Sequence, residues 1–206
     1  MATSTFTTVV FDLGGVLIDW NPRYLYRRIF ADEAEMEAFL ATVCTPAWND
    51  EQDAGRPLAE ATALLVGQHP QHAAAIRAYY DRLGEMFSGP IAGSVAVLEE
   101  LRQAGRHRLY ALTNWSHETF PYAQRTFDFL AWFEGIVVSG TEQTRKPYPA
   151  IYHTLLRRYA LDPVQTLFID DNATNIRAAE ALGLTGIHFH SPEQLRAALV
   201  GHRVLV

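Results

Sequence analysis

The sequence predicts an α/β fold: a doubly wound parallel, Rossmann-like sheet core with a small all-helical cap inserted after the first strand. Residues 7–11 have the β-branched, apolar pattern of a buried strand. Residues 20–89 then show helix-like patterns only, interrupted by prolines. After Pro90, apolar runs alternate with amphipathic stretches of about 10–13 residues, which is typical of parallel βαβ units. The expected domains are 1–19 with 90–206 as the α/β core and 20–89 as the cap.

Four helices are expected in the cap, because apolar residues recur there at helical spacing, as Met36, Phe39 and Val43 do. These helices are expected at Arg23–Phe30, Glu33–Val43, Leu58–Gly67 and Gln71–Phe87. Since the cap directly follows the first strand, it can fold back over the edge of the sheet where that strand ends.

The rest of the core is expected as alternating helices and strands. A helix at Ser94–Gln103 ends at Gly105, which is a C-terminal cap signal. The strands that follow are expected at 108–112, 136–138 and 166–169, and the helices after them at about 116–127, 149–160 and 172–182. Gly183 ends the last helix, and residues 185–189 and 203–205 are candidates for further short strands.

Composition excludes several classes of function. The chain has 206 residues, 49% hydrophobic and 19% charged, as in an ordinary soluble globular protein. Its net charge of −6 argues against nucleic acid as a partner, which requires a basic face. No apolar stretch approaches the ~18 residues of a membrane span, and no basic segment typical of a signal peptide precedes the first strand. A cytoplasmic enzyme is expected, and the single cysteine, Cys44, is expected to serve packing.

Polar residues follow four of the expected strands. They are Asp12, Thr113 with Asn114, Ser139, and Asp170 with Asp171. In an open parallel α/β sheet, ligands bind outside the carboxyl ends of the strands. We therefore expect these side chains to meet at one edge of the sheet.

Asp12 lies beside a turn that contains Gly14 and Gly15. A carboxylate in this position can attack a phosphoryl group and form an aspartyl-phosphate, which divides one difficult hydrolysis into two easier steps. The glycines allow backbone amides to approach phosphate oxygens, because no side chain intervenes. A strand-end aspartate that only caps a turn is the alternative.

Asp170 and Asp171 are adjacent acids at the end of an apolar run. Two like charges about 4 Å apart repel by about 4 kcal/mol at an effective dielectric constant of 20. Mg²⁺ removes this repulsion, because proteins bind it with one or two carboxylates together with phosphate and water. Alternatively, one acid caps the next helix and the other is solvated, but Asn172 can supply that cap. We expect Mg²⁺ as the cofactor.

Lys146, Thr113 and Asn114 are the expected phosphate-binding side chains. Lys146 precedes Pro147, so its backbone is extended, and its ammonium group can point at the edge of the sheet. Arg145 competes for this role, and a solvated surface lysine is the alternative. Thr113 and Asn114 can donate hydrogen bonds to phosphate oxygens, although Thr-Asn is also an ordinary strand-to-helix turn.

Together these residues resemble the haloacid dehalogenase-like (HAD) hydrolase superfamily. Four motifs occur in the order and spacing expected there: Val9–Leu17, Leu112–Asn114, Lys146-Pro147 and Phe168–Asn172. The resemblance covers essentially the whole chain, because the helical insertion looks like the superfamily's cap. The subgroup most similar in appearance includes bacterial α-D-glucose-1-phosphate phosphatase, which also begins with Asp-Leu-Gly.

The resemblance implies a Mg²⁺-dependent phosphatase that hydrolyses a small phosphoester, such as a sugar phosphate, through an aspartyl-phosphate on Asp12. The implied metal ligands are Asp12, the Gly14 carbonyl and Asp171, with Asp170 and Asn175 in supporting positions. The implied phosphoryl-binding residues are Thr113, Asn114 and the catalytic Lys146. Charge neutralisation and in-line positioning would supply most of the rate.

The chain departs from the superfamily at Gly14, where most of its phosphatases carry an aspartate. That aspartate protonates the leaving oxygen and later activates water, which is typically worth about 10²–10⁴-fold in rate. We therefore expect good leaving groups, such as anomeric sugar phosphates, to be favoured. In the cap, Trp48 with Asp50 or Glu51 can contact a sugar, although Trp48 is equally expected to pack the cap interior.

Two other functions fit parts of the pattern. In 2-haloacid dehalogenation, Asp12 would displace halide from carbon without a metal, but dehalogenases of the family lack paired acids such as Asp170 and Asp171. A phosphate-binding regulator that has lost turnover with the missing acid is the second. Metal-dependent phosphate release, metal-independent halide release, or neither, separates the three functions.

Overall fold

A parallel sheet of five strands, in the order β5-β4-β1-β6-β7, organises the larger part of the molecule. The strands are β1 (Thr8–Phe11), β4 (Arg108–Thr113), β5 (Gly135–Val138), β6 (Thr166–Asp170) and β7 (Thr185–His188). They belong to a computed structural model that describes residues 5–205. The central strand is β1, whose Phe11 is in register with Ala111 on one side and Ile169 on the other. The predicted parallel α/β sheet is confirmed.

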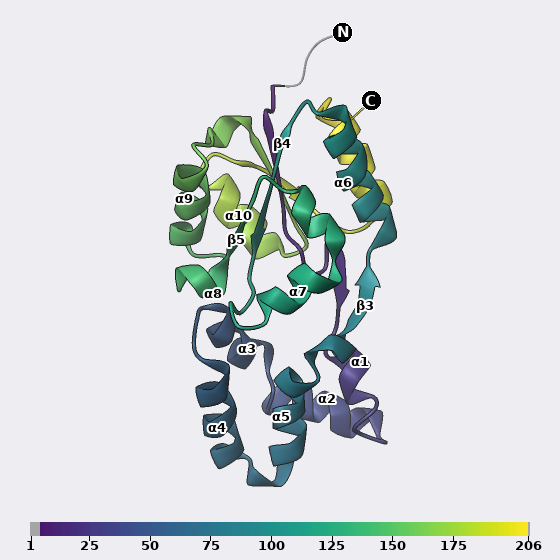
Figure 1. Cartoon of the computed structure of the whole chain (residues 1–206), viewed down its shortest axis with the longest axis vertical. Helices are drawn as coiled ribbons and strands as arrows, with labels where there is room; N and C mark the ends of the chain where they lie inside the picture. The colour runs from purple at the N-terminus through teal and green to yellow at the C-terminus, as the bar shows by residue number, and fades with distance from the viewer. Residues whose placement is uncertain (1–4, 206) are drawn as a thin grey trace.

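Helices cover both faces of this sheet. They are α6 (Ala92–Ala104), α7 (Phe120–Thr126), α8 (Ser139–Glu142), α9 (Pro149–Arg158), α10 (Ala173–Glu180) and α11 (Pro192–Gly201). Figure 1 shows α6 on one side of the sheet and α9 and α10 on the other. Two short 3₁₀ helices, η3 (Asp128–Trp132) and η4 (Pro163–Gln165), lie in the connections.

Two apolar clusters fill the space between the sheet and its helices. Successive strand residues point to opposite faces, so Phe11 packs in the cluster that includes α6, α7 and α11, whereas Val10 packs in the cluster with α9 and α10. Both side chains are completely buried. Burial on both faces explains why the strands are continuous apolar runs.

The helical insertion forms a second body at the opposite end of the molecule from the two termini (Figure 1). Its helices are α1 (Arg23–Tyr26), α2 (Glu33–Thr42), α3 (Pro46–Asp53), α4 (Leu58–Gln68) and α5 (Ala73–Asp81), with 3₁₀ turns η1 (Pro70–His72) and η2 (Leu83–Met86). It has an apolar cluster of its own, in which Tyr26 lies 5.0 Å from Phe39 between ring centroids. Cys44 is buried in the same cluster, consistent with a role in packing.

Two short antiparallel strands, β2 (Ile18–Trp20) and β3 (Phe87–Pro90), connect the two bodies. They lie at both ends of the predicted cap, residues 20–89. We propose that the domain boundaries fall at this pair of strands, with 1–19 and 90–206 as the core.

The structure differs from the predicted elements in several places. Helix α3 and strands β2 and β3 were not predicted, and neither was α11. The helix predicted to run to Phe87 ends at Asp81, because the chain turns through η2 into β3. Residues 203–205 do not form a strand: Arg203 has φ +59°, and the chain turns there so that Val204 and Leu205 join the apolar cluster.

Among residues 5–205, no helix combines the length and the apolar character needed to cross a membrane.

Candidate active site

The carboxyl ends of three adjacent strands bring the predicted site residues together. Asp12 directly follows β1, Thr113 is the last residue of β4, and Asp170 is the last residue of β6. Since β1 lies between β4 and β6 in the sheet, all three residues reach the same edge. All three are buried, with at most 8% of their surface exposed.

Lys146 occupies the centre of this group. Its Nζ lies 2.9 Å from Oδ1 of Asp12 and 2.7 Å from Oδ2 of Asp170, and it donates a hydrogen bond to the carbonyl oxygen of Leu112 at 2.9 Å. Burial alone would lower the pKa of Lys146, but the charges of the two carboxylates and their hydrogen bonds raise it overall. Lys146 is therefore a buried cation between two acids.

Asn114 fixes the backbone of Lys146. Its Oδ1 accepts from the Lys146 N–H at 2.8 Å, and its Nδ2 donates to the Lys146 carbonyl at 3.0 Å. Arg145 points elsewhere: its guanidinium lies 3.4 Å from Asp50 of the cap. Of the two neighbouring cations, Lys146 is the one that meets Asp12.

Asp170 is held from several directions. Asn175 donates from Nδ2 to both carboxylate oxygens at 3.0 and 3.1 Å, and the backbone N–H of Asn172 donates to Oδ1 at 2.8 Å. Asn172 also caps α10, since its Oδ1 accepts from the N–H of Thr174. The structure thus assigns the cap to Asn172 and leaves Asp171 uncommitted to the helix.

Asp12 has one oxygen engaged by two donors. The backbone N–H of Leu13 donates to Oδ1 at 2.7 Å, and Lys146 approaches the same oxygen. Neither donor uses Oδ2. Burial raises the pKa of Asp12 to about 8, and the Lys146 ammonium opposes this shift.

Asp12, Asp170 and Asp171 can each place a carboxylate oxygen within 4.8 Å of the others. Oxygen donors are the ligands that Mg²⁺ prefers, and one buried lysine does not neutralise three carboxylates. The donor set therefore fits a divalent cation. Asp171 as a residue is exposed, but its carboxylate is partly desolvated; this desolvation and the Asp170 charge raise its pKa. It lies against Gly15, whose φ is +73°: a Cβ there would be 2.3 Å from Oδ2 of Asp171.

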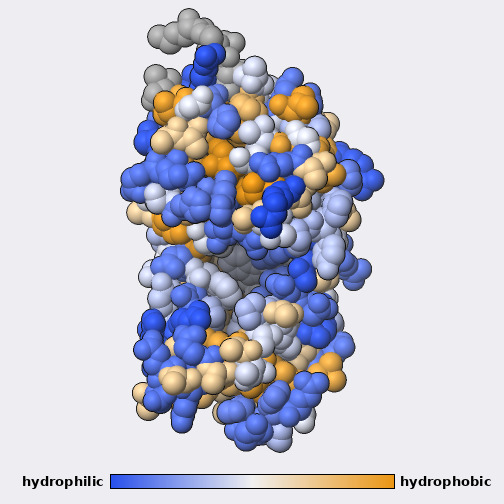
Figure 2. Space-filling view, turned by 180° about the vertical axis from the view of Figure 1, so that it is seen from behind, coloured by the Kyte–Doolittle hydropathy of each residue, from blue (hydrophilic) through white to orange (hydrophobic). Residues whose placement is uncertain are grey.

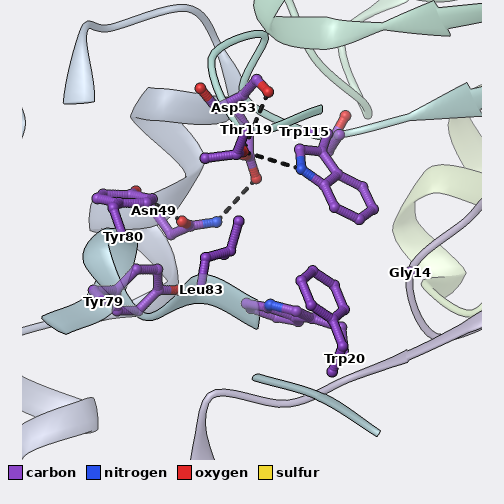
Figure 3. Close-up of a pocket in the computed structure, with 12 residues that line it drawn as sticks. Gly14, Trp20, Asn49, Asp53, Tyr79, Tyr80, Leu83, Trp115 and Thr119 are labelled. Carbon is purple, nitrogen blue, oxygen red and sulfur yellow. Dashed lines mark hydrogen bonds between the residues drawn. The ribbon is translucent and has the colours of Figure 1, made fainter. Parts of the chain in front are cut away.

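A cavity of about 90 Å³ opens beside Gly14, between the core and the cap. Its walls come from both bodies and are largely aromatic or apolar (Figure 3): Trp20, Tyr79, Tyr80, Leu83, Phe87 and Trp115, with Asn49, Asp53, Asn114, Ser116 and Thr119 as polar members. Seen from behind, the surface is hollowed between the two bodies (Figure 2). A Cβ placed on Gly14 would meet no atom within 4 Å, so this position has open space.

A second cavity, of about 520 Å³, lies in the cap next to the first. Four residues line both cavities: Trp20, Asn49, Asp53 and Tyr79. Trp48, a candidate for contact with a sugar, packs instead at 5.1 Å from Tyr79 between ring centroids. Asp50 pairs with Arg145.

Several polar residues of the cavity wall were not identified as site residues from the sequence, and Asp53 is the ionisable one among them. Asp53, at the end of α3, shares the cavity with Gly14, and its backbone carbonyl accepts a hydrogen bond from the Ser139 hydroxyl of the core. It follows a run of polar residues in which nothing in the sequence distinguishes it from Asp50 or Glu51.

Comparison with known proteins agrees with this architecture. A family model described as haloacid dehalogenase-like hydrolase matches residues 6–183. A sesquiterpene phosphatase, astK from Aspergillus oryzae, is 26% identical over 185 residues, which is 90% of both chains.

Solved structures share the fold. A predicted HAD-like family hydrolase from Porphyromonas gingivalis superposes with a TM-score of 0.74 at 24% identity, covering 96% of this chain and 98% of its own. A HAD family enzyme from Bacteroides thetaiotaomicron, in complex with magnesium and inorganic phosphate, gives a TM-score of 0.66 at 20% identity over 90% and 95% of the chains. An L-2-haloacid dehalogenase from Xanthobacter autotrophicus gives 0.63 at 17% identity over 98% and 85%.

Proposed function

The chain belongs to the haloacid dehalogenase-like hydrolases, and from this we propose that it is a Mg²⁺-dependent phosphatase that hydrolyses a small phosphoester through an aspartyl-phosphate on Asp12. The observation that carries the proposal is the cluster of Asp12, Asp170 and Asp171 around buried Lys146. Three acids beside one lysine suit a site that takes up a divalent cation and a phosphate together.

Each residue has a role in this proposal. Oδ2 of Asp12 attacks phosphorus, while Lys146 and the Leu13 N–H hold Oδ1 and fix the direction of attack. Asp12, Asp171 and the Gly14 carbonyl would hold Mg²⁺, with Asp170 in a supporting position through Lys146 and Asn175. When bound, the metal would neutralise charge on the phosphoryl oxygens.

Thr113, Lys146 and Asn114 are the proposed phosphoryl-binding residues. Lys146 supplies the positive charge, and Thr113 lies at the end of the neighbouring strand. Both polar atoms of the Asn114 side chain already bond to the backbone of Lys146. We therefore propose that Asn114 contributes mainly by positioning Lys146.

The organic part of the substrate would lie in the cavities between the core and the cap. A sugar phosphate is the expectation from the sequence. The smaller cavity also fits a second candidate, the phosphate ester of an apolar alcohol, because Trp20, Leu83 and Phe87 give it an extended apolar wall beside its polar residues. The Aspergillus oryzae relative, named a sesquiterpene phosphatase, supports this second candidate.

The proposal is tested by phosphate release with and without Mg²⁺. Sugar 1-phosphates, sugar 6-phosphates and the monophosphates of C5–C15 alcohols form the substrate panel. Metal-dependent release that Asp12→Asn abolishes supports the phosphatase. Metal-independent halide release from 2-haloacids would indicate a dehalogenase, and a folded protein inert in both assays would indicate a phosphate-binding regulator.

A further inference from the structure

We propose that Asp53, supplied by the cap, is the general acid–base that the Gly14 position lacks. The proposal rests on the phosphatase function proposed above. It concerns a carboxylate outside the four motifs, and it is carried by the position of that carboxylate, by its fixed orientation and by the charges around it.

Asp53 and Gly14 line the same cavity, one from the cap and the other from the turn that follows Asp12. Figure 3 shows the Asp53 side chain at the cavity wall, where Asn49 hydrogen-bonds to it. The side chain of Asp53 is partly exposed, because it opens to this space. A leaving group that extends from the phosphoryl site toward the cap would enter the cavity that Gly14 and Asp53 both line.

Asp53 is also anchored to the core. The backbone N–H of Ser116, three residues beyond the end of β4, faces the Asp53 carboxylate and favours its charged form. The hydroxyl of Ser139, directly after β5, donates to the Asp53 carbonyl oxygen. Asp53 is therefore tied to the same edge of the sheet as the proposed nucleophile, although it belongs to the cap.

A series of hydrogen bonds within the cap orients the Asp53 side chain. Nε2 of Gln52 donates to Oη of Tyr80 at 3.1 Å, Tyr80 donates to Oδ1 of Asn49 at 3.0 Å, and Nδ2 of Asn49 donates to Oδ2 of Asp53 at 3.0 Å. Gln52 is completely buried and also donates to the carbonyl of Trp48 at 2.7 Å. Each donor in this series points toward Asp53, so the series of hydrogen bonds fixes the rotamer of Asp53.

The charges around Asp53 suit proton transfer near neutral pH. Burial and the nearby Asp50 carboxylate raise the pKa of Asp53 to about 7, against the Ser116 N–H and the cations Arg145 and Lys146, which lower it. The phenols of Tyr79 and Tyr80 also face it. Both protonation states of Asp53 are therefore populated at pH 7, as an acid that later becomes a base requires.

The two steps balance with Asp53 in both roles. In the first, Oδ2 of Asp12 bonds to phosphorus, the bond from phosphorus to the ester oxygen breaks, and that oxygen takes the proton of Asp53 and leaves as the alcohol. In the second, a water oxygen bonds to phosphorus and gives one proton to the Asp53 carboxylate. The bond from phosphorus to Asp12 breaks, so that Asp12 is again a carboxylate, Asp53 is again protonated and inorganic phosphate leaves.

Pre-steady-state kinetics of Asp53→Asn with p-nitrophenyl phosphate and Mg²⁺ tests this assignment. The p-nitrophenolate leaving group needs no acid, so the first step should proceed within about threefold of the wild-type rate. The second step lacks its base and should slow by about 10²–10⁴-fold. The expected result is a burst of p-nitrophenol equal to the enzyme concentration, and acid quenching should recover a phosphorylated protein.

An alkyl phosphate gives the complementary result, because its leaving group does need an acid. With this substrate, Asp53→Asn should show no burst and a first step slowed by about 10²–10⁴-fold. Asp81→Asn, an exposed aspartate at the end of α5, is the matched control and should behave as the wild type with both substrates. If Asp53 had a merely structural role, Asp53→Asn would lower the turnover of both substrates equally and would give no burst.

The outcomes separate this inference from the proposed function. If the wild type releases phosphate, Asp12→Asn abolishes that release and Asp53→Asn matches the wild type with both substrates, the phosphatase function stands and the role of Asp53 is refuted. If the wild type is inert toward every phosphoester, both proposals fall. A burst confined to p-nitrophenyl phosphate supports both.

Discussion

Lys146 and Asp170 form an ion pair that is shielded from water: Nζ lies 2.7 Å from Oδ2, and the two side chains are 1% and 0% exposed. Oδ1 of Asp12 lies 2.9 Å from the same ammonium group. Burial of a charge is costly unless it is paired and hydrogen-bonded. The site therefore depends on one lysine both for its stability and for the position of its proposed nucleophile.

Lys146→Met should lower the free energy of unfolding by about 3–5 kcal/mol, because two buried carboxylates lose their partner. Urea denaturation at pH 7 measures this loss, and phosphate release should fall by at least about 10²-fold, as when a stabilising group is removed from a transition state. Arg145→Met is the control for stability, since the pair it makes with Asp50 is partly exposed and such pairs contribute about 0–1 kcal/mol. Equal losses of stability in the two variants would contradict the central role of Lys146.

Gly14 and Gly15 provide a matched pair of substitutions. Gly15→Ala should lower the free energy of unfolding by about 1–2 kcal/mol, because φ is +73° and the new Cβ would lie 2.3 Å from Oδ2 of Asp171. It should also raise the Mg²⁺ concentration for half-maximal activity, since Asp171 must move. Gly14→Ala has no atom within 4 Å of its Cβ and should change neither quantity beyond error. Urea denaturation measures the stability, and Mg²⁺ titration of the activity measures the half-maximal concentration. If Gly15→Ala changed neither quantity, the proposed role of Asp171 as a metal ligand beside Gly15 would be contradicted.

Much of the core was predictable because its signals are local. An apolar run that is buried on both faces predicts a central strand, and the polar residues that follow such runs must share one edge of a parallel sheet. These two signals are enough to predict that Asp12, Thr113 and Asp170 lie together. The role of Asn114 was not predictable in detail, because its partner is the backbone of Lys146, which lies 32 residues away.

The cap was predictable only as a set of helices. Helix α3 buries one residue, Gln52, so its sequence carries no apolar periodicity, although Thr45 as N-cap and Pro46 at its start are recognisable signals. Asp53 stands among other polar residues, and only its contacts with Ser116 and Ser139 distinguish it. Such contacts between two bodies have no local signal in the sequence.

Gly14→Asp should act differently in two backgrounds if Asp53 is the acid–base. In the wild type, Asp53 already supplies the proton, so turnover of an alkyl phosphate should change by less than about threefold. In the Asp53→Asn background, the new carboxylate can occupy the open space at residue 14. It should raise the turnover of the alkyl phosphate at least about tenfold above that of Asp53→Asn alone. Steady-state assays of the four proteins measure this coupling. A large gain in the wild-type background would instead favour the interpretation that the acid is missing altogether.

Asp53 should also leave a signature in the dependence of stability on pH. Its pKa is about 7 in the folded protein, against 3.8 for an unperturbed aspartate, so the folded state binds the proton more tightly. Its contribution to stability is then fully present below about pH 4 and is lost as the pH rises through about 7.

Asp53→Asn removes this one titration and leaves the other groups in place. The free energy of unfolding of the variant relative to the wild type should therefore rise by about 1–3 kcal/mol between pH 4 and pH 8, because only the wild type loses this contribution as Asp53 ionises. Urea denaturation without Mg²⁺ or phosphate at several pH values measures the difference. A difference that does not change with pH would mean that Asp53 has an ordinary pKa and is ionised at neutral pH, which would remove its ability to protonate the leaving oxygen.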